Sequence, residues 1–129
     1  MSDAVPGVAS SLLVQGTVVS QTNLRGDGVP ELHPAVSRFF DALPPESKAP
    51  FLGRCAESAL VSDQLWLIDS RRTDGLTTTL QEAADHFSGS AMVSKLIRES
   101  GDPRHGQKTT PCPACGALLD ELGIRFLGP

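Results

Sequence analysis

The pattern of hydrophobic and polar residues in the first third of the chain predicts two short strands and a loop. Residues 12–20 (LLVQGTVVS) are rich in residues that favour strands, and Gly16 among them suits a turn or a bulge. Residues 23–28 (NLRGDG) have the composition of a turn and predict a loop. Residues 1–10 (MSDAVPGVAS) are small and contain Pro and Gly, so we expect a flexible tail before a single domain at residues 11–129.

Apolar residues at helical spacing predict helices in the middle of the chain. One helix is expected from residue 33 to about residue 43, where two prolines end it. Its apolar face consists of Val36, Phe39, Phe40 and Leu43. A second helix is expected at about residues 53–68. Residues 75–90 fit no single pattern, and within them residues 80–87 are compatible with a short helix.

The C-terminal third predicts a strand, a loop, a helix and a strand in that order. Residues 91–97 (AMVSKLI) fit a central strand, and residues 101–110 form a polar loop. A helix opens at Pro111 and ends at Gly123, because proline is favoured in the first turn of a helix and glycine just after its end. Residues 124–127 (IRFL) form a last strand. The order β-β-α-α-β-α-β predicts parallel pairing and an α/β sheet with helices on both faces.

Composition and charge narrow the classes of function. The chain has 129 residues, 40% of them hydrophobic and 20% charged, which is typical of one globular domain. No apolar run approaches the roughly 20 residues that span a bilayer. No Lys or Arg precedes the apolar residues 11–14, so we expect no signal peptide there. We therefore expect a cytoplasmic protein with no membrane partner, exported only as part of a larger protein. The net charge of −4 argues against a dedicated nucleic-acid binder, although basic residues gather at Arg98, Arg104, His105 and Lys108.

The three cysteines fall in two motifs and predict a metal site rather than disulfides. Cys112 and Cys115 share one face of the helix that opens at Pro111, in its first turn. Unpaired backbone N–H groups and the positive end of the helix dipole stabilise thiolates there. With Cys55 at the start of a facing helix, they give one Zn²⁺ per chain three protein ligands. Such an ion keeps its fourth position for water, as in catalytic zinc sites.

Glu57 stands two residues after the first predicted ligand. Residues two apart on an ideal helix differ by about 200° in rotation, so Cys55 and Glu57 converge only where Cys55 lies at the irregular start of the helix. A glutamate placed there is not a ligand, but it can accept a proton from water and pass it to the reacting substrate. Arg54 and the helix dipoles would offset the net negative charge of zinc with three thiolates.

Two motifs carry a resemblance to known proteins. Cys-Ala-Glu at residues 55–57, followed by Pro-Cys-Pro-Ala-Cys at residues 111–115, is similar to the signature of the cytidine-deaminase-like superfamily. Cysteine stands here where histidine is the commoner first ligand. From about Val14 onward the chain resembles the YwqJ-like deaminases of bacteria. The stretches that carry this resemblance are His33-Pro34-Ala35-Val36, Gly53-Arg54-Cys55-Ala56-Glu57 and Pro111-Cys112-Pro113-Ala114-Cys115-Gly116-Ala117-Leu118-Leu119.

The resemblance implies a fold, a reaction and a set of site residues. The implied fold is the cytidine-deaminase-like three-layer α/β sandwich, in which helices cover both faces of a mixed sheet. The implied zinc ligands are Cys55, Cys112 and Cys115, and the implied catalytic residue is Glu57. The implied reaction is hydrolytic deamination of a nucleobase, cytosine to uracil in nucleic acid or nucleotide. The implied setting is a bacterial toxin or conflict system, with an immunity protein as partner.

Six residues are candidate substrate contacts. Asn23 follows the predicted strands, where the superfamily often has a substrate-binding asparagine, and it also suits a turn. Trp66 is compatible with stacking on a base or with a place in the core. The other candidates are Arg54, Ala56, Arg104 and His105.

Other functions fit the same residues. The acidic net charge also suits a deaminase of a free base or nucleoside in metabolism. A non-enzymatic interaction module would have a closed structural zinc site, with His33, His86 or His105 as the fourth ligand. Redox chemistry at Cys112 and Cys115 would leave Cys55 without a role. The sequence does not set the oligomeric state.

Overall fold

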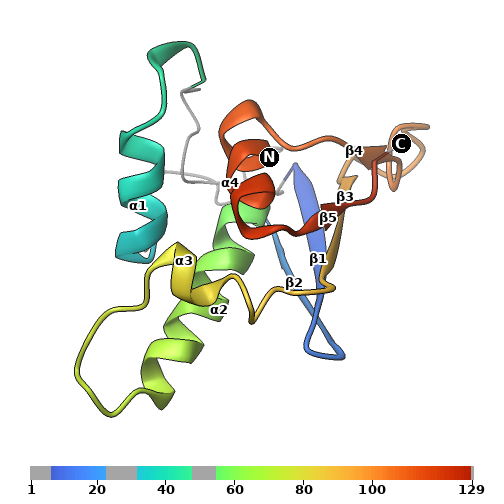
Figure 1. The fold of residues 1–129 in the computed structure, drawn as a ribbon. Coiled ribbons are helices and arrows are strands. Elements are labelled where there is room, and N and C mark those ends of the chain that lie inside the picture. Colours follow the sequence, from blue (N-terminus) through green and yellow to red (C-terminus); the bar gives the residue numbers. More distant parts are fainter. Residues whose placement is uncertain (1–6, 23–31, 48–54, 129) are drawn as a thin grey trace.

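A five-stranded mixed sheet forms one layer of the molecule (Figure 1). The computed structural model describes residues 7–22, 32–47 and 55–128. The strands are β1 (Val8–Val14), β2 (Thr17–Thr22), β3 (Ala91–Leu96), β4 (Lys108–Thr109) and β5 (Arg125–Phe126). Their order is β2-β1-β3-β4, and β5 also pairs with β3. The sheet is mixed because β3 runs antiparallel to β1 and β4 but parallel to β5.

β1 and β2 form a hairpin around Gly16, where the sequence predicts a turn or a bulge. Val14 pairs with Thr17, and the two residues between them have positive φ angles, 51° for Gln15 and 76° for Gly16. A two-residue turn with both φ angles positive matches the twist of a hairpin, and glycine adopts it without steric cost. β1 begins at Val8, so the sheet extends into the segment expected to be a tail. Residues 1–6 of that segment lie outside the described residues.

The described residues include four α-helices and one short 3₁₀ helix. They are α1 (Pro34–Asp41), η2 (Pro45–Ser47), α2 (Ala56–Arg71), α3 (Leu80–Ala83) and α4 (Pro113–Leu122). His33 caps the start of α1, where its Nδ1 accepts a hydrogen bond from the backbone N–H of Ala35 at 3.1 Å. Gly123 ends α4 with a φ angle of 71°, as its position predicts. None of these helices combines the length and the apolar character needed to cross a bilayer.

Three elements differ from the expectation. α4 begins at Pro113 instead of Pro111, because Cys112 is the N-cap and Pro113 takes the first helical position. The short helix expected at residues 80–87 ends at Ala83. β4 lies in a segment expected to be a loop, because Lys108 and Thr109 pair with β3 through backbone groups that a side-chain pattern does not report.

The core lies between the sheet and the helices, which gather on one side of it (Figure 1). Leu12 of β1 and Met92 of β3 are fully buried on this side, where α2 packs against β1 and β2. Leu13 and Val18 lie on the opposite face and are exposed. The mixed α/β class is confirmed, but among the described helices no second layer covers that opposite face. Antiparallel pairing, which dominates this sheet, permits one face to remain in water.

Candidate metal centre

The three cysteines lie where the N-termini of α2 and α4 meet. Cys55 is the N-cap of α2 and has an extended backbone, and its side chain makes no capping hydrogen bond. Because it caps no backbone N–H group, the Cys55 sulfur is available for other contacts. Ser58 Oγ donates to the Cys55 carbonyl oxygen at 2.9 Å. Cys112 is the N-cap of α4, and its Sγ accepts a hydrogen bond from the backbone N–H of Cys115 at 3.4 Å. Both cysteine motifs are therefore at helix starts, as their spacing predicts.

The sulfur atoms form a cluster that fits a tetrahedral metal ion. All three lie within 4.8 Å of one another, and Cys55 Sγ is 3.8 Å from Cys112 Sγ. Two sulfurs bound to one zinc ion at about 2.3 Å with a tetrahedral angle are about 3.8 Å apart. Among the described residues, no other group of three or more His, Cys, Asp or Glu side chains is arranged in this way. The cluster could therefore hold a metal ion such as zinc.

The thiols of the cluster interact strongly with one another. The pKa of Cys112 is lowered to about 2 by hydrogen bonds from Cys115 and Cys55 and from the backbone N–H groups of Cys115 and Ala114. The pKa of Cys55 is raised to about 12, chiefly because its thiol donates a hydrogen bond to Cys112. The pKa of Cys115 is raised for the same reason. Hydrogen bonds thus couple the three sulfurs, and binding of a metal ion would release the protons of those thiols that become thiolate ligands.

Glu57 is the second residue of α2, in the first turn of the helix, and it is buried. Only 4% of the residue is exposed, and Oε2 accepts a hydrogen bond from Ser94 Oγ at 2.6 Å. The extended backbone of Cys55 takes this residue out of the helical geometry, and the Glu57 carboxylate is close enough to contribute to the raised pKa of the Cys55 thiol. Glu57 is not part of the group of three possible metal ligands. Glu57 therefore lies near the cluster without belonging to its three possible ligands.

Ser94 and Ser10 are residues of this region that the sequence did not identify. They are paired opposite each other on β3 and β1, and their Oγ atoms are 2.5 Å apart. Both serines are buried. The sequence signal that could have identified Ser94 is a serine at an inward-facing position of an apolar strand. That signal points to Glu57 only when the fold is known.

The three histidines are all engaged away from the cysteine cluster. His33 Nε2 hydrogen bonds Asp69 Oδ2 at 2.7 Å, and its Nδ1 caps α1. His86 Nε2 donates to Gln64 Oε1 at 2.8 Å. His105 Nδ1 accepts from the backbone N–H of Arg98 at 3.0 Å. None of them joins the cluster, so the alternative with histidine as a fourth ligand has no support among the described residues.

The structure describes four of the six candidate substrate contacts, and it does not bring all four together. Asn23 and Arg54 lie outside the described residues. Ala56, the first residue of α2, is fully buried. Trp66 is 45% exposed and therefore not a core residue; its ring contacts His33 edge-on at 4.7 Å. It lies ten residues after Ala56, which is about 15 Å along a helix axis.

Arg104 and His105 lie in the turns between β3 and β4. Arg104 forms a salt bridge with Asp102 at 2.9 Å, which raises the pKa of its guanidinium. Arg98 donates to the carbonyl oxygens of Gly7 and Ile97. Three of the four basic residues expected to gather here are thus already bonded within the fold, because His105 also accepts from the backbone N–H of Arg98.

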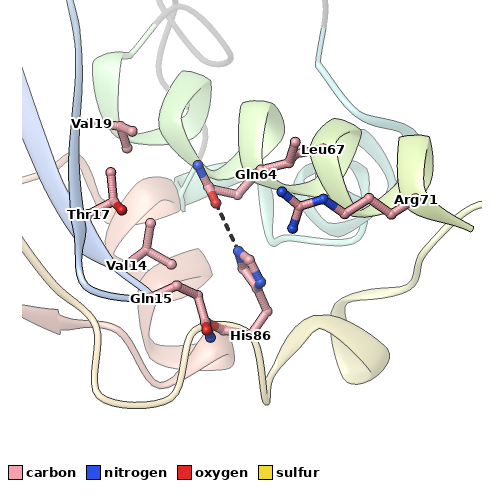
Figure 2. Close-up of a pocket in the computed structure, with 8 residues that line it drawn as sticks. All are labelled: Val14, Gln15, Thr17, Val19, Gln64, Leu67, Arg71 and His86. Atoms are coloured by element: carbon pink, nitrogen blue, oxygen red, sulfur yellow. Dashed lines mark hydrogen bonds between the residues drawn. The ribbon is translucent and has the colours of Figure 1, made fainter.

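A separate pocket of about 340 Å³ lies near the other end of α2 (Figure 2). It is lined by Val14, Gln15, Thr17, Val19, Gln64, Leu67, Arg71 and His86. Figure 2 shows Arg71 and His86 directed toward the same space, with the hydrogen bond from His86 to Gln64 across it. Burial and the nearby Arg71 lower the pKa of His86, so its imidazole is neutral at pH 7. No cysteine lines this pocket.

Comparison with known proteins gives one match. A family model described as YwqJ-like deaminase matches residues 1–124. The matched residues include both cysteine motifs, Glu57 and the two buried serines. The search of curated proteins found no match, and the search of solved structures found none.

Proposed function

Because the chain belongs to the YwqJ-like deaminase family, we propose that it is a zinc-dependent hydrolytic deaminase of a nucleobase. One observation carries this proposal. A cluster of three cysteine sulfurs, with no fourth side chain among the described residues, adjoins a buried glutamate that is not a ligand. Catalytic zinc sites keep one position open, whereas structural sites close all four with protein ligands. The cluster therefore supports a catalytic centre with Cys55, Cys112 and Cys115 as ligands of one Zn²⁺.

The reaction replaces an amino group on a ring carbon by the oxygen of water and releases ammonia. Zinc bound by the three thiolates would supply a water molecule activated at neutral pH. Glu57 would accept a proton at a carboxylate oxygen, deliver it to the adjacent ring nitrogen, and serve the departing amine in the same way. The carboxylate lies at the positive end of α2, which stabilises its charge between proton transfers.

We propose cytosine as the base, converted to uracil in nucleic acid or nucleotide, and a role in a bacterial toxin or conflict system. In that setting an immunity protein would be the partner. The family supports this substrate class.

A second candidate, deamination of a free base or nucleoside in metabolism, is favoured by one observation: Arg104 and Arg98 are already bonded to groups of the fold. Fewer cations then remain for the phosphates of a polynucleotide.

Ammonia release from a panel of substrates tests this proposal. The zinc-loaded protein is incubated with cytosine, cytidine, dCMP, single-stranded DNA, double-stranded DNA and RNA, and a chelated sample serves as the control. We expect release from at least one substrate, abolished by chelation and restored by zinc. Rates on DNA or RNA should fall steeply with salt, because phosphate contacts release counterions. Release only from cytosine or cytidine would support the metabolic candidate, and no release from any substrate would refute the proposal.

A further inference from the structure

A chain of buried hydroxyl groups leads from the sheet to the carboxylate of Glu57. Ser94 Oγ donates to Glu57 Oε2 at 2.6 Å, and Ser10 Oγ lies 2.5 Å from Ser94 Oγ. Ser94 has a single hydroxyl proton, which it gives to the carboxylate, so Ser10 must be the donor in the bond between the two serines. The hydrogen bonds therefore point in one direction, from Ser10 through Ser94 to Glu57.

Burial of the two serine hydroxyls costs free energy of folding, which their hydrogen bonds must offset. Both side chains point from the sheet into the core, next to Leu12 and Met92 in the same strands. A buried hydroxyl costs free energy without a partner, and an apolar residue would pack there at no such cost. Serines occupy both members of one cross-strand pair, and this pair is the one that faces Glu57.

The hydrogen bond from Ser94 restricts the carboxylate to one orientation. It engages Oε2 and leaves Oε1 for proton exchange, and it fixes the rotation of a side chain that has three rotatable bonds. The bond from Ser10 in turn fixes the hydroxyl of Ser94, since that oxygen then has both a donor and an acceptor partner. Serines of β1 and β3 thus hold the Glu57 carboxylate at the start of α2.

We propose that Ser94, supported by Ser10, is a positioning residue that holds Glu57 in the orientation needed for proton transfer. This inference rests on the proposed function, because it assigns Glu57 the proton transfers of that reaction. Misplacement of a reacting group by about 1 Å can cost on the order of 10²-fold in rate. Loss of the Ser94 hydroxyl should therefore reduce turnover without affecting the metal ligands.

The test compares serine-to-alanine variants at three buried positions in the zinc-loaded protein. Ser94→Ala should lower kcat about 10- to 100-fold with KM and zinc content unchanged. Ser10→Ala should lower kcat by a smaller factor, because Ser94 can still donate to Glu57. Ser90→Ala is the matched control: its hydroxyl is buried without a hydrogen-bond partner in the described part of the chain, and kcat should not change.

The result that overturns the proposal is a kcat for Ser94→Ala within threefold of the parent, or a loss equal to that of Ser90→Ala. A raised KM with an unchanged kcat in Ser94→Ala would also contradict the proposal, since the positioning of a proton carrier affects turnover. If the parent protein itself releases no ammonia, the proposed function fails, and crystal structures of parent and Ser94→Ala then decide the inference separately. A single Glu57 conformer in the parent that becomes disordered in the variant supports positioning, and an unchanged conformer refutes it.

Discussion

Both ends of α2 carry clusters of polar side chains, but the hydrogen-bonding groups of the two clusters find different kinds of partner. At the C-terminal end, Asp69 accepts from His33 Nε2 at 2.7 Å and from the backbone N–H of Thr78 at 2.8 Å. Arg72 forms salt bridges with Asp74 and Glu82. At the N-terminal end, the sulfur of Cys55 contacts another sulfur, and the cluster has neither a histidine nor a cation among the described residues.

The difference separates residues that hold the fold from residues that are prepared for a ligand. His33 uses both ring nitrogens within the protein, so it has no capacity left for a metal ion or a proton transfer. Among the described residues, the three thiols have only each other and backbone N–H groups as partners, and they would have to lose protons to become three thiolates. We therefore interpret His33, whose ring nitrogens are both hydrogen-bonded, as a structural residue, and the three cysteines as the candidate metal site.

The largest expected effect comes from removing a ligand at the N-terminal end. Cys115→Ser should reduce zinc from about one ion per chain to a trace, because no other His, Cys, Asp or Glu of the described residues joins the cluster. It should also lower the free energy of unfolding by about 4 kcal/mol or more, since metal binding is coupled to folding. Elemental analysis and denaturant titration measure the two effects. Full zinc content in Cys115→Ser, or a chelated parent as stable as the zinc-loaded protein, would break the comparison.

A smaller effect, confined to stability, is expected at the C-terminal end. His33→Ala should lower the free energy of unfolding by about 3 kcal/mol, because it removes a helix cap and the partner of Asp69. His33→Asn is the matched control, since asparagine can still accept the capping hydrogen bond and should recover about 1 kcal/mol. Zinc content should equal that of the parent in both variants. Loss of zinc from His33→Ala with an unchanged melting temperature would assign His33 to the metal site.

The smallest expected effect concerns His86 in the pocket near the same end. Burial and Arg71 lower the pKa of His86 below its usual 6.5, so the folded state favours the neutral ring. The unfolded state then binds more protons, and this contribution to stability is present above pH 6.5 and lost as the pH falls. Unfolding measured from pH 7.5 to pH 5 should show a smaller loss for His86→Gln than for the parent. Equal losses in the two proteins would contradict the lowered pKa.

Much of this site could be predicted from the sequence because it depends on local spacing. The spacing of Cys112 and Cys115 around Pro113, and of Cys55 and Glu57, places each pair at the start of a helix. The strands around Gly16 and the helix ended by Gly123 follow from equally local rules. The family match confirms the resemblance that the two cysteine motifs carry.

What the sequence could not give depends on contacts between distant segments. Ser10 and Ser94 are 84 residues apart, and their register across β1 and β3 decides that they meet beneath Glu57. β4 consists of two residues recruited by backbone pairing, which no side-chain pattern marks. Trp66, compatible with the core by composition, is 45% exposed, and its ring contacts that of His33, which lies 33 residues earlier in the chain.

Ammonia release by Glu57→Gln, measured beside the parent at equal zinc content, tests the central claim most directly. Glutamine keeps the shape of the side chain and can accept the hydrogen bond from Ser94, but it cannot carry the proton. We predict that zinc content and melting temperature stay near those of the parent while turnover falls by about 10²–10⁴-fold, the range of general acid–base catalysis. Turnover within tenfold of the parent, or loss of zinc from the variant, would contradict the account.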